Sequence, residues 1–568
     1  MLGLELIDWI VIAVYLAGIT FIGLWAVRKV RSSASFFIGD RKFGKVMMAF
    51  FMFGSGTHSD QAVSVAAKTY STGVSGIWYQ WLWLFVTPFF WLIAPFFRRM
   101  RAVTTGDYFE IRYGRSVSGL YAAMGILPLT VALGVMLKGS GVVVEAVSGG
   151  AISSNLAIIA MTVIFLIYGV AGGLSAAIAT NFVQGLLTVV LSFLILPFAL
   201  AKVGGMSGLR ESISDPDMLS LVSPGEITLF YIIIIAFNAL VGWVTMPETM
   251  ANCAAGKTEM EGRTGVTVGI FGKRICTIAW MLTGLCAVVI YRELAEPDQA
   301  YGQMARDLLP DIAPGLIGLF IACLLASVMS TCDSLMVVAS ALFTENIYKK
   351  FFVVGRADKH YTLVGRIASA LAVILGIFVA FNLESVVKGL EFYWMVSALM
   401  GIAFWAGLFW RRATAAGAWA ATLTSLGVFL FTSTNPLGVI PWDFNAHFAD
   451  KLPAFMLWEG KLYLPWQMII YLSAGFVVMV VVSLFTKRAP AENLDRFYAC
   501  LRTPIGPDEP EAEPFTLPAG VQPGPRNVLI SHPDFEIPRP TLVGIGGFLA
   551  AWAGVGLLIG AVYWIIQG

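Results

Sequence analysis

Residues 46–70 read VMMAFFMFGSGTHSDQAVSVAAKTY, an apolar run that small and polar residues interrupt from Gly54 to Gln61. The two glycines of the interruption weaken a helix, and non-helical backbone at membrane depth is tolerated only where it is buried in protein or lines a cavity. Close packing of small residues against another helix is the alternative, but it does not account for His58, Asp60 and Gln61 together. The stretch therefore predicts a membrane helix that is broken near its middle and forms a site.

The composition of the whole chain also indicates a membrane protein. Of its 568 residues, 58% are hydrophobic and 13% charged, and the mean hydropathy is +0.79, whereas a soluble domain has about 45–50% apolar and about 25% charged residues. A soluble enzyme, a nucleic-acid binder and a disordered protein are therefore not expected. The six cysteines form no CxxC pair, so neither a disulfide framework nor a cysteine metal site is predicted.

Fourteen segments have the roughly 20 apolar residues that a spanning helix needs. The first has acidic residues before it and basic residues after it, the reverse of a secretory signal peptide. The fourteen candidates are 6–27, 46–70, 76–97, 118–148, 155–171, 175–201, 227–250, 266–291, 313–348, 363–384, 388–410, 414–432, 466–486 and 541–566.

Lysine and arginine are distributed unequally between alternate connecting segments. With the N-terminus outside, we count 28 of the 37 basic residues in inside segments and eight in outside segments, and only Lys138 within a span. Basic residues favour the cytoplasmic side, so both termini are predicted to lie outside the cell. The membrane is predicted to be the cell membrane. The Pro-rich segment 487–540 is too poor in apolar residues to bury its own core, and we expect it to be a cytoplasmic linker to the last helix.

The ninth span has hydroxyl side chains on one face. Ser327, Ser330, Thr331 and Ser334 follow the spacing i, i+3, i+4 and i+7. Such hydroxyls, together with carbonyl oxygens of a broken helix, make a neutral oxygen site for a hard monovalent cation such as Na⁺. Hydrogen bonds from these hydroxyls to carbonyls one turn earlier are an equally common explanation. Asp333 favours a site, because a carboxylate at membrane depth requires a counter-charge or a cation.

Other polar groups at predicted membrane depth have more than one explanation. A tight turn at the start of the sixth span, with packing of its polar residues, is favoured over a ligand site there. The aromatic cluster around Gln80 fits a binding site or a membrane-interface belt equally well. Lys138 is positioned to bind a substrate carboxylate or to neutralise Asp60 or Asp333, and these alternatives stay open.

The sequence contains no motif of a known catalytic site in a context that would support that site. There is no HExxH, no phosphate-binding loop of the Walker type and no GxSxG turn. No nucleophile and base converge, so a membrane enzyme is the least supported class. Transport through such a protein would be driven by a gradient or be passive.

With these segments, the chain resembles the sodium/solute symporter family, whose members carry sugars, amino acids, carboxylates, vitamins and iodide. The resemblance covers about residues 5–430, and the order and spacing of its motifs are specific. They are 8–10 (DWI), 36–41 (FFIGDR), 98–114 (RRMRAVTTGDYFEIRYG), 168–184 (YGVAGGLSAAIATNFVQ), 326–334 (ASVMSTCDS), 345–349 (ENIYK) and 409–418 (FWRRATAAGA).

The resemblance implies an all-α membrane fold of the leucine-transporter type. Two inverted five-helix repeats, spans 2–6 and 7–11, would form the core, with spans 2 and 7 broken and the second break near 238–243. The expected divisions are a first flanking helix and loop (1–45), the first repeat (46–201), the second repeat (202–410), additional helices (411–486), the linker (487–540) and a C-terminal helix (541–568).

The resemblance also implies site residues. The main sodium site would use carbonyls of Gly54, Thr57 and Ser327 and hydroxyls of Ser330 and Thr331. Some members bind a second cation through an aspartate in the sixth span. Here that position is an asparagine and the carboxylate lies on the ninth span, which puts the second site in doubt; its residues would be Asn181, Asp333 and Ser334. By looser alignment, the substrate residues would be His58, Asp60, Gln61, Gln80, Trp83, Lys138 and Trp243.

The function expected from the sequence is Na⁺-coupled symport of a small polar solute, a sugar or polyol or an organic acid, by alternating access. The partners would be Na⁺, the solute and the lipid bilayer, with no organic cofactor, no nucleic acid and no obligatory protein partner. One alternative is proton coupling through Asp333, Asp60 or His58. Another is a membrane sensor that binds the solute without transporting it.

Overall fold

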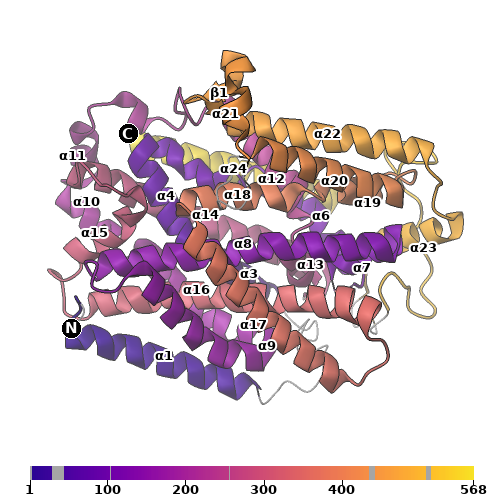
Figure 1. Cartoon of the computed structure of the whole chain (residues 1–568), viewed down its shortest axis with the longest axis horizontal. Helices are drawn as coiled ribbons and strands as arrows, with labels where there is room; N and C mark the ends of the chain where they lie inside the picture. Colours follow the sequence, from indigo (N-terminus) through magenta and orange to yellow (C-terminus); the bar gives the residue numbers. More distant parts are fainter. Residues whose placement is uncertain are drawn as a thin grey trace.

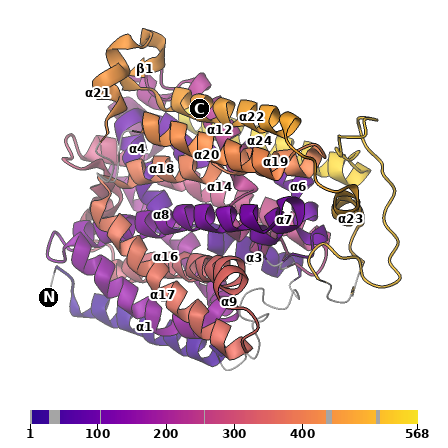
Figure 2. The same cartoon turned by 45° about the vertical axis from the view of Figure 1, so that its right-hand side comes forward.

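The computed structural model describes residues 3–27, 44–102, 104–254, 256–433, 442–506, 509 and 513–568. Many of the long helices run along a common direction, others cross them obliquely, and both chain termini lie at one end of the molecule (Figure 1), which we call the terminal end. The short helices α7 (Thr105–Tyr113) and α23 (Ala491–Arg502) lie at the opposite end, the distal end (Figures 1 and 2). That both termini lie outside the membrane stays a prediction.

Most predicted spans are helices with nearly the expected bounds. Nine helical stretches in the described part of the chain are long and apolar enough to cross a membrane, so the count of fourteen spans stays a prediction. The helices with no break near their middle include α1 (Leu6–Val27), α8 (Arg115–Val147), α14 (Glu259–Ile290), α17 (Asp358–Asn382), α20 (Ala415–Thr432), α22 (Leu464–Phe485) and α24 (Leu542–Gln567).

Other predicted spans consist of two or more consecutive elements. They are η2 (Gly73–Ile77), α5 (Trp78–Trp81) and α6 (Thr87–Arg99); α16 (Leu316–Ala341) and the π-helix η5 (Leu342–Phe352); and α18 (Val386–Ala398) and α19 (Gly401–Phe409). Short elements connect the long helices. They are α10 (Leu196–Lys202), α11 (Gly205–Ser212), η3 (Pro216–Leu219), η4 (Pro297–Gln299), α15 (Ala300–Leu308), α21 (Phe444–Phe448), η6 (Ala449–Lys451), η7 (Ala454–Met456) and the antiparallel strands β1 (Leu457–Trp458) and β2 (Lys461–Leu462).

The predicted break in the second span is confirmed. Helix α3 (Lys45–Gly56) ends directly after the glycines, and α4 (Ser59–Thr72) begins two residues later. Between them Thr57 and His58 are extended, with φ/ψ of −121°/113° and −140°/161°. The His58 N–H, which starts the new helix, donates to Gln61 Oε1 at 3.5 Å. The break therefore has its own local support in the polar residues that follow it.

The seventh span is also broken, slightly later than predicted. Helix α12 (Leu229–Trp243) is followed by the non-helical residues 244–246 and by α13 (Pro247–Ala254). Pro247 has no N–H, and its fixed φ favours the first position of a new helix. The second break therefore falls immediately after the range 238–243 that the sequence indicated.

The fifth and sixth spans fall within one helical element, α9 (Ser154–Leu194), whose two ends both lie near one end of α8. Its first residue, Ser154, donates its N–H to Glu145 near the end of α8. Near its other end, the Leu191 carbonyl accepts from Tyr301 of α15, which packs against the same end of α8. A straight helix of this length would separate its ends by about 60 Å. Two antiparallel spans, as predicted, account for both contacts.

Helix α14 packs directly on α3 through glycines. A Cβ at Gly269 would lie 2.8 Å from Met52 Cβ, 2.9 Å from the Ala49 carbonyl and 3.0 Å from the Phe53 nitrogen. Because the side chain of Gly269 is only a hydrogen atom, the backbones of α14 and α3 can approach closely, as they do at many helix contacts in membranes. Helix α3 is therefore held in place along the face that leads to the break.

We expect Gly269→Ala to lower the free energy of unfolding by about 1–3 kcal/mol, the usual cost of overpacking a close contact. The measurement is thermal unfolding of the purified protein. Gly427→Ala on α20 is the matched control, because no atom lies within 4 Å of the position that its Cβ would take. If the two variants unfold at the same temperature, the close approach of α14 to α3 is wrong.

The segment 487–540, which we call the distal segment, is not a free linker. Its residues Leu494, Phe497, Tyr498, Leu501 and Phe515 are buried, and α23 packs on α6 and α7. The composition of the segment predicted that it has no core of its own. It did not predict that the apolar residues of the segment would pack into the core of the helical bundle.

Candidate functional site

The five predicted sodium-site residues meet where the break of the second span contacts α16. The Ser330 hydroxyl donates to the Gly54 carbonyl and the Ser327 hydroxyl to the Thr57 carbonyl, both at 3.3 Å. The Thr331 hydroxyl donates to the Ser327 carbonyl at 3.4 Å. The last carbonyls of α3 are available because a helix end leaves them without intrahelical partners.

This junction is a set of neutral oxygens in a buried place. Thr57, Ser327, Ser330 and Thr331 are all buried, and the Thr57 hydroxyl has no hydrogen-bond partner among the residues that the structure describes. Unwound carbonyls and hydroxyls of this kind coordinate Na⁺ in transporters with broken helices. The chemistry of the oxygens therefore suits the predicted ion, without a carboxylate among them.

The second predicted cation site is only partly visible. Asp333 and Ser334 are buried on α16, and the Ser334 hydroxyl donates to the Ser330 carbonyl at 3.1 Å. The side chain of Asn181 lies outside the described residues. Whether the three side chains meet stays a prediction.

A cavity of about 150 Å³ lies beside this junction of α3 and α16. That is smaller than the roughly 300–1,000 Å³ of pockets for drug-sized ligands, so in this conformation it suits a small solute. The residues around it come from both sides of the break and from eight other helices. They are Met52, Gly56, His58, Asp60, Gln61, Gln80, Trp83, Phe90, Ala132, Val135, Met136, Trp243, Met246, Glu248, Thr249, Cys253, Val266, Ile270, Lys273, Arg274, Thr331, Ser334, Leu335, Leu390, Tyr393 and Trp394.

Six of the seven predicted substrate residues line this cavity, and Lys138 does not. Lys138 is on α8, close enough to Asp298 of the η4 turn to affect its charge. Burial raises the pKa of Asp298, and the Val386 N–H and Lys138 partly oppose that rise. The structure thus places Lys138 near an acid in a connecting segment and outside the cavity lining.

The polar residues after the break interact with one another. His58 Nδ1 pairs with Asp60 Oδ1, and His58 Nε2 lies 2.9 Å from Gln61 Nε2. Asp60 is buried. A buried carboxylate needs such a partner, so this local triad explains how an acid is retained at the cavity wall.

Sequence reasoning missed two cationic residues in the cavity wall, Lys273 and Arg274. The inside count above includes both with the segment before α14, although they fall within the predicted span 266–291; without these two the count is 26. The signal that could have found them is the presence of two adjacent charges inside an apolar run. Both are buried in the middle of α14.

The two cations differ in their partners. Arg274 Nη1 donates to the Gln80 carbonyl, but its Nε has no hydrogen-bond partner among the described residues. Lys273 is 6% exposed, and no described residue forms an ion pair or hydrogen bond with its amino group. The cavity wall also contains Glu248, whose Oε2 is buried without a partner in the described structure. Unpaired donors and acceptors therefore face one space.

Aromatic rings form part of the cavity wall, and Tyr79 packs against one of them, Trp394. The Phe90 and Trp243 rings have centroids 3.9 Å apart, and those of Tyr79 and Trp394 are 5.2 Å apart. Trp394 is on α18 and Trp243 ends α12, so the rings come from separate elements. They exclude water around the polar groups, which strengthens electrostatic contacts inside.

The sequence matches the sodium:solute symporter family over residues 36–425. The chain belongs to this family. It is 24% identical to the sodium/glucose cotransporter of Vibrio parahaemolyticus, covering 77% of this chain and 87% of that protein. It is also 24% identical to the high-affinity proline transporter PutP of Bacillus subtilis (strain 168), covering 76% and 93% of the two chains.

The solved structures show the fold of the symporter. A Na⁺-coupled sialic acid symporter in a substrate-bound, outward-open state superposes with a TM-score of 0.71 at 18% identity, covering 86% of this chain and 99% of that one. A nucleobase-cation-symport-1 family transporter gives 0.52 at 12% identity, covering 82% and 98%. The all-α membrane fold of the leucine-transporter type is thus confirmed, and the protein is a Na⁺-coupled solute symporter.

Proposed function

We propose that this symporter binds Na⁺ at the junction of α3 and α16 and carries a small solute with an anionic group through the adjacent cavity. The observation that carries the proposal is that Thr331 belongs to both places. Its hydroxyl is part of the sodium oxygen set, and it lines the cavity. Binding of one partner therefore changes the surroundings of the other directly.

The broken helix connects the two sites mechanically. Na⁺ would hold the Gly54 and Thr57 carbonyls against α16, which fixes the position of His58 and the residues that follow it. Those residues line the cavity. A ligand shifts a conformational equilibrium only through its different affinities for the two states, and this shared backbone gives Na⁺ and solute a common preference. That is the basis we propose for coupling and alternating access.

The charges of the wall favour an organic acid over an uncharged sugar or polyol. A buried cation without a counter-charge is costly, and Lys273 has no acid within ion-pair distance in the described residues. Asp60 is already paired with His58. A solute carboxylate would supply the missing charge to Lys273 and Arg274, while Glu248 and Gln80 would accept hydrogen bonds from hydroxyl or amino groups of the same solute.

We further propose that the symporter resides in a cell membrane with both termini outside and the distal end in the cytoplasm. The proposal rests on basic residues at the distal end, among them Arg99, Arg101, Arg112 and Arg411, because positive charge favours the cytoplasmic side. Labelling of a cysteine placed at either terminus, with an impermeant reagent on intact cells and after lysis, tests this orientation. A terminus that an impermeant reagent reaches only after lysis would contradict it.

Uptake in proteoliposomes tests the coupling ion. With a panel of radiolabelled hydroxy and amino carboxylates, we expect an inward Na⁺ gradient to raise initial uptake about 5- to 150-fold over an equal K⁺ gradient, the range of typical coupling free energies. A proton gradient without Na⁺ should have no effect. Uptake that follows pH alone would establish proton coupling instead, and binding without accumulation would establish a sensor.

A further inference from the structure

The cavity lies between two groups of helices. Contacts among the lining helices define the groups: α3, α4, α6 and α13 all pack on α14, and α16 and α18 both pack on α8. Access to the cavity from the distal end requires the distal ends of the two groups to separate. Anything that joins both groups at that end opposes the separation.

The distal segment is joined to the end of α6 by a buried ion pair. Arg101 Nε and Nη2 donate to the two carboxylate oxygens of Glu509 at 2.6 and 2.9 Å, and both side chains are buried. The Phe515 N–H donates to the Met100 carbonyl at 2.9 Å. Bidentate contacts between arginine and carboxylate are among the strongest polar contacts in proteins.

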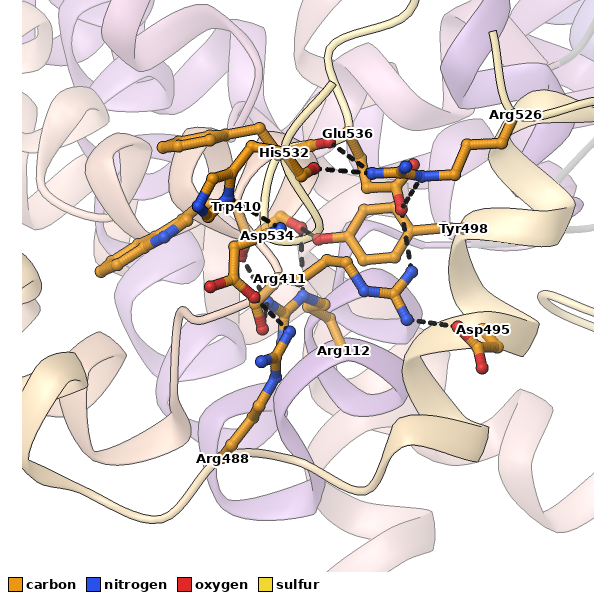
Figure 3. A network of polar contacts seen from close by, with 12 residues as sticks. Arg112, Trp410, Arg411, Arg488, Asp495, Tyr498, Arg526, His532, Asp534 and Glu536 are labelled. Carbon is orange, nitrogen blue, oxygen red and sulfur yellow. Dashed lines mark hydrogen bonds and ion pairs between the residues drawn. The ribbon is translucent and has the colours of Figure 1, made fainter. Parts of the chain in front are cut away.

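The same segment is joined to the end of α19, which continues α18. The Glu536 N–H donates to the Phe409 carbonyl at 2.9 Å, and Arg411 Nη1 donates to Glu536 Oε1 at 2.8 Å. Arg411 also pairs with Asp495, and its N–H donates to the Asp534 carbonyl. Figure 3 shows Arg411 at the centre of these contacts, reached by acids from two parts of the distal segment.

Backbone geometry at the first attachment is unusual. Arg101 and Phe515 each have a φ of 53° and so lie in the left-handed region, where residues other than glycine are uncommon. Arg101 follows α6 and Phe515 belongs to the distal segment, so the two residues lie on the two stretches of the chain that meet at the attachment. Such conformations persist only where surrounding structure enforces them, and they cluster at switch regions. Release of the segment would let both residues relax.

We propose that the distal segment is a conformational clamp on the transport cavity. Docked, it connects α6 to α19 across the line between the two helix groups and keeps the cavity closed at the distal end. Release from one attachment is required before that end opens. The inference rests on the proposed function only in assuming that the cavity opens alternately, and its test involves neither Na⁺ nor solute.

Native cysteines report the two events separately. Cys500 is on α23 of the distal segment and is buried where the segment docks beside Arg101, and burial raises the pKa of its thiol, so it is protected from alkylation in two ways. Cys253 lines the cavity and is fully buried. It lies at the distal end of α13, three residues before Gly256, whose carbonyl accepts from Arg98 of α6. Exposure of Cys500 reports release, and exposure of Cys253 reports opening.

The experiment compares alkylation of the full-length protein in nanodiscs by N-ethylmaleimide, with each cysteine followed by peptide mass spectrometry. In the double variant Glu509→Gln/Glu536→Gln, we expect Cys500 and Cys253 both to react at least roughly tenfold faster than in the wild type. Glu513→Gln, an exposed acid of the same segment, is the matched control and should react like the wild type. The buried Cys286 and Cys323 should stay unreactive, which shows that the bundle remains folded.

Two results overturn the clamp. Faster reaction of Cys500 with Cys253 unchanged means that the segment detaches without opening the cavity. No change at either thiol means that these acids do not hold the segment. If the double variant does not fold, Arg411→Lys replaces it, since a lysine keeps the charge but cannot bridge Asp495 and Glu536 as the guanidinium does, and the same two thiols decide.

Discussion

Ser330→Ala/Thr331→Ala should abolish the stabilisation of the symporter by Na⁺. A ligand at 100 times its Kd adds about 2.7 kcal/mol to the free energy of unfolding. The double variant removes two of the five oxygens that meet at the junction of α3 and α16, including the hydroxyl that faces the Gly54 carbonyl. We therefore expect the rise in melting temperature on exchanging K⁺ for Na⁺ to disappear, as measured by thermal unfolding in detergent.

Ser340→Ala is the matched control for this experiment. Ser340 is a buried serine of the same helix, and its hydroxyl donates to the Val337 carbonyl within that helix. It lies away from the break, so its variant should keep the full response to Na⁺. An equal response in the wild type and in the double variant would show that Na⁺ binds elsewhere, and the assignment of Gly54, Thr57 and Ser327 would fall with it.

The break in the second span and the hydroxyls on one face of α16 could be predicted because their signals are local. Glycines and polar residues between two apolar runs mark the break, and the helical period places Ser327, Ser330 and Thr331 on one face. Carbonyl ligands need only a helix end, which the same stretch supplies. Such features depend on a few neighbouring residues and on the membrane, so a single sequence is sufficient to indicate them.

The charged part of the cavity could not be predicted because it depends on how distant helices are rotated. The sequence shows that Lys138 and Lys273 are both in apolar runs, but not which of them faces the centre. In the structure Lys138 acts near Asp298, whereas Lys273 lines the cavity. Docking of the distal segment is similar, since Arg101 and Glu509 are 408 residues apart and no local pattern joins them.

Because α14 is oriented so that Lys273 lines the cavity, Lys273→Gln is the second substitution with a large expected effect, here on solute binding. A charge-assisted hydrogen bond contributes about 1.5–3 kcal/mol, so its loss should weaken binding of an anionic solute about 10- to 150-fold. Glutamine keeps a polar group of similar size but removes the charge. The measurement is a thermal-shift screen in Na⁺ with small hydroxy and amino carboxylates and with uncharged polyols, followed by titration of the strongest ligand.

Lys138→Gln is the matched control, because it makes the same substitution at the lysine that the sequence favoured and the structure places outside the cavity. We expect carboxylates to stabilise the wild type and Lys138→Gln equally, and Lys273→Gln only weakly. Loss of binding in Lys138→Gln alone would assign the carboxylate to α8 and show that the cavity in this conformation is not the solute site. Stabilisation of all three proteins by polyols would instead make the solute uncharged, with Lys273 a hydrogen-bond donor to its hydroxyl groups.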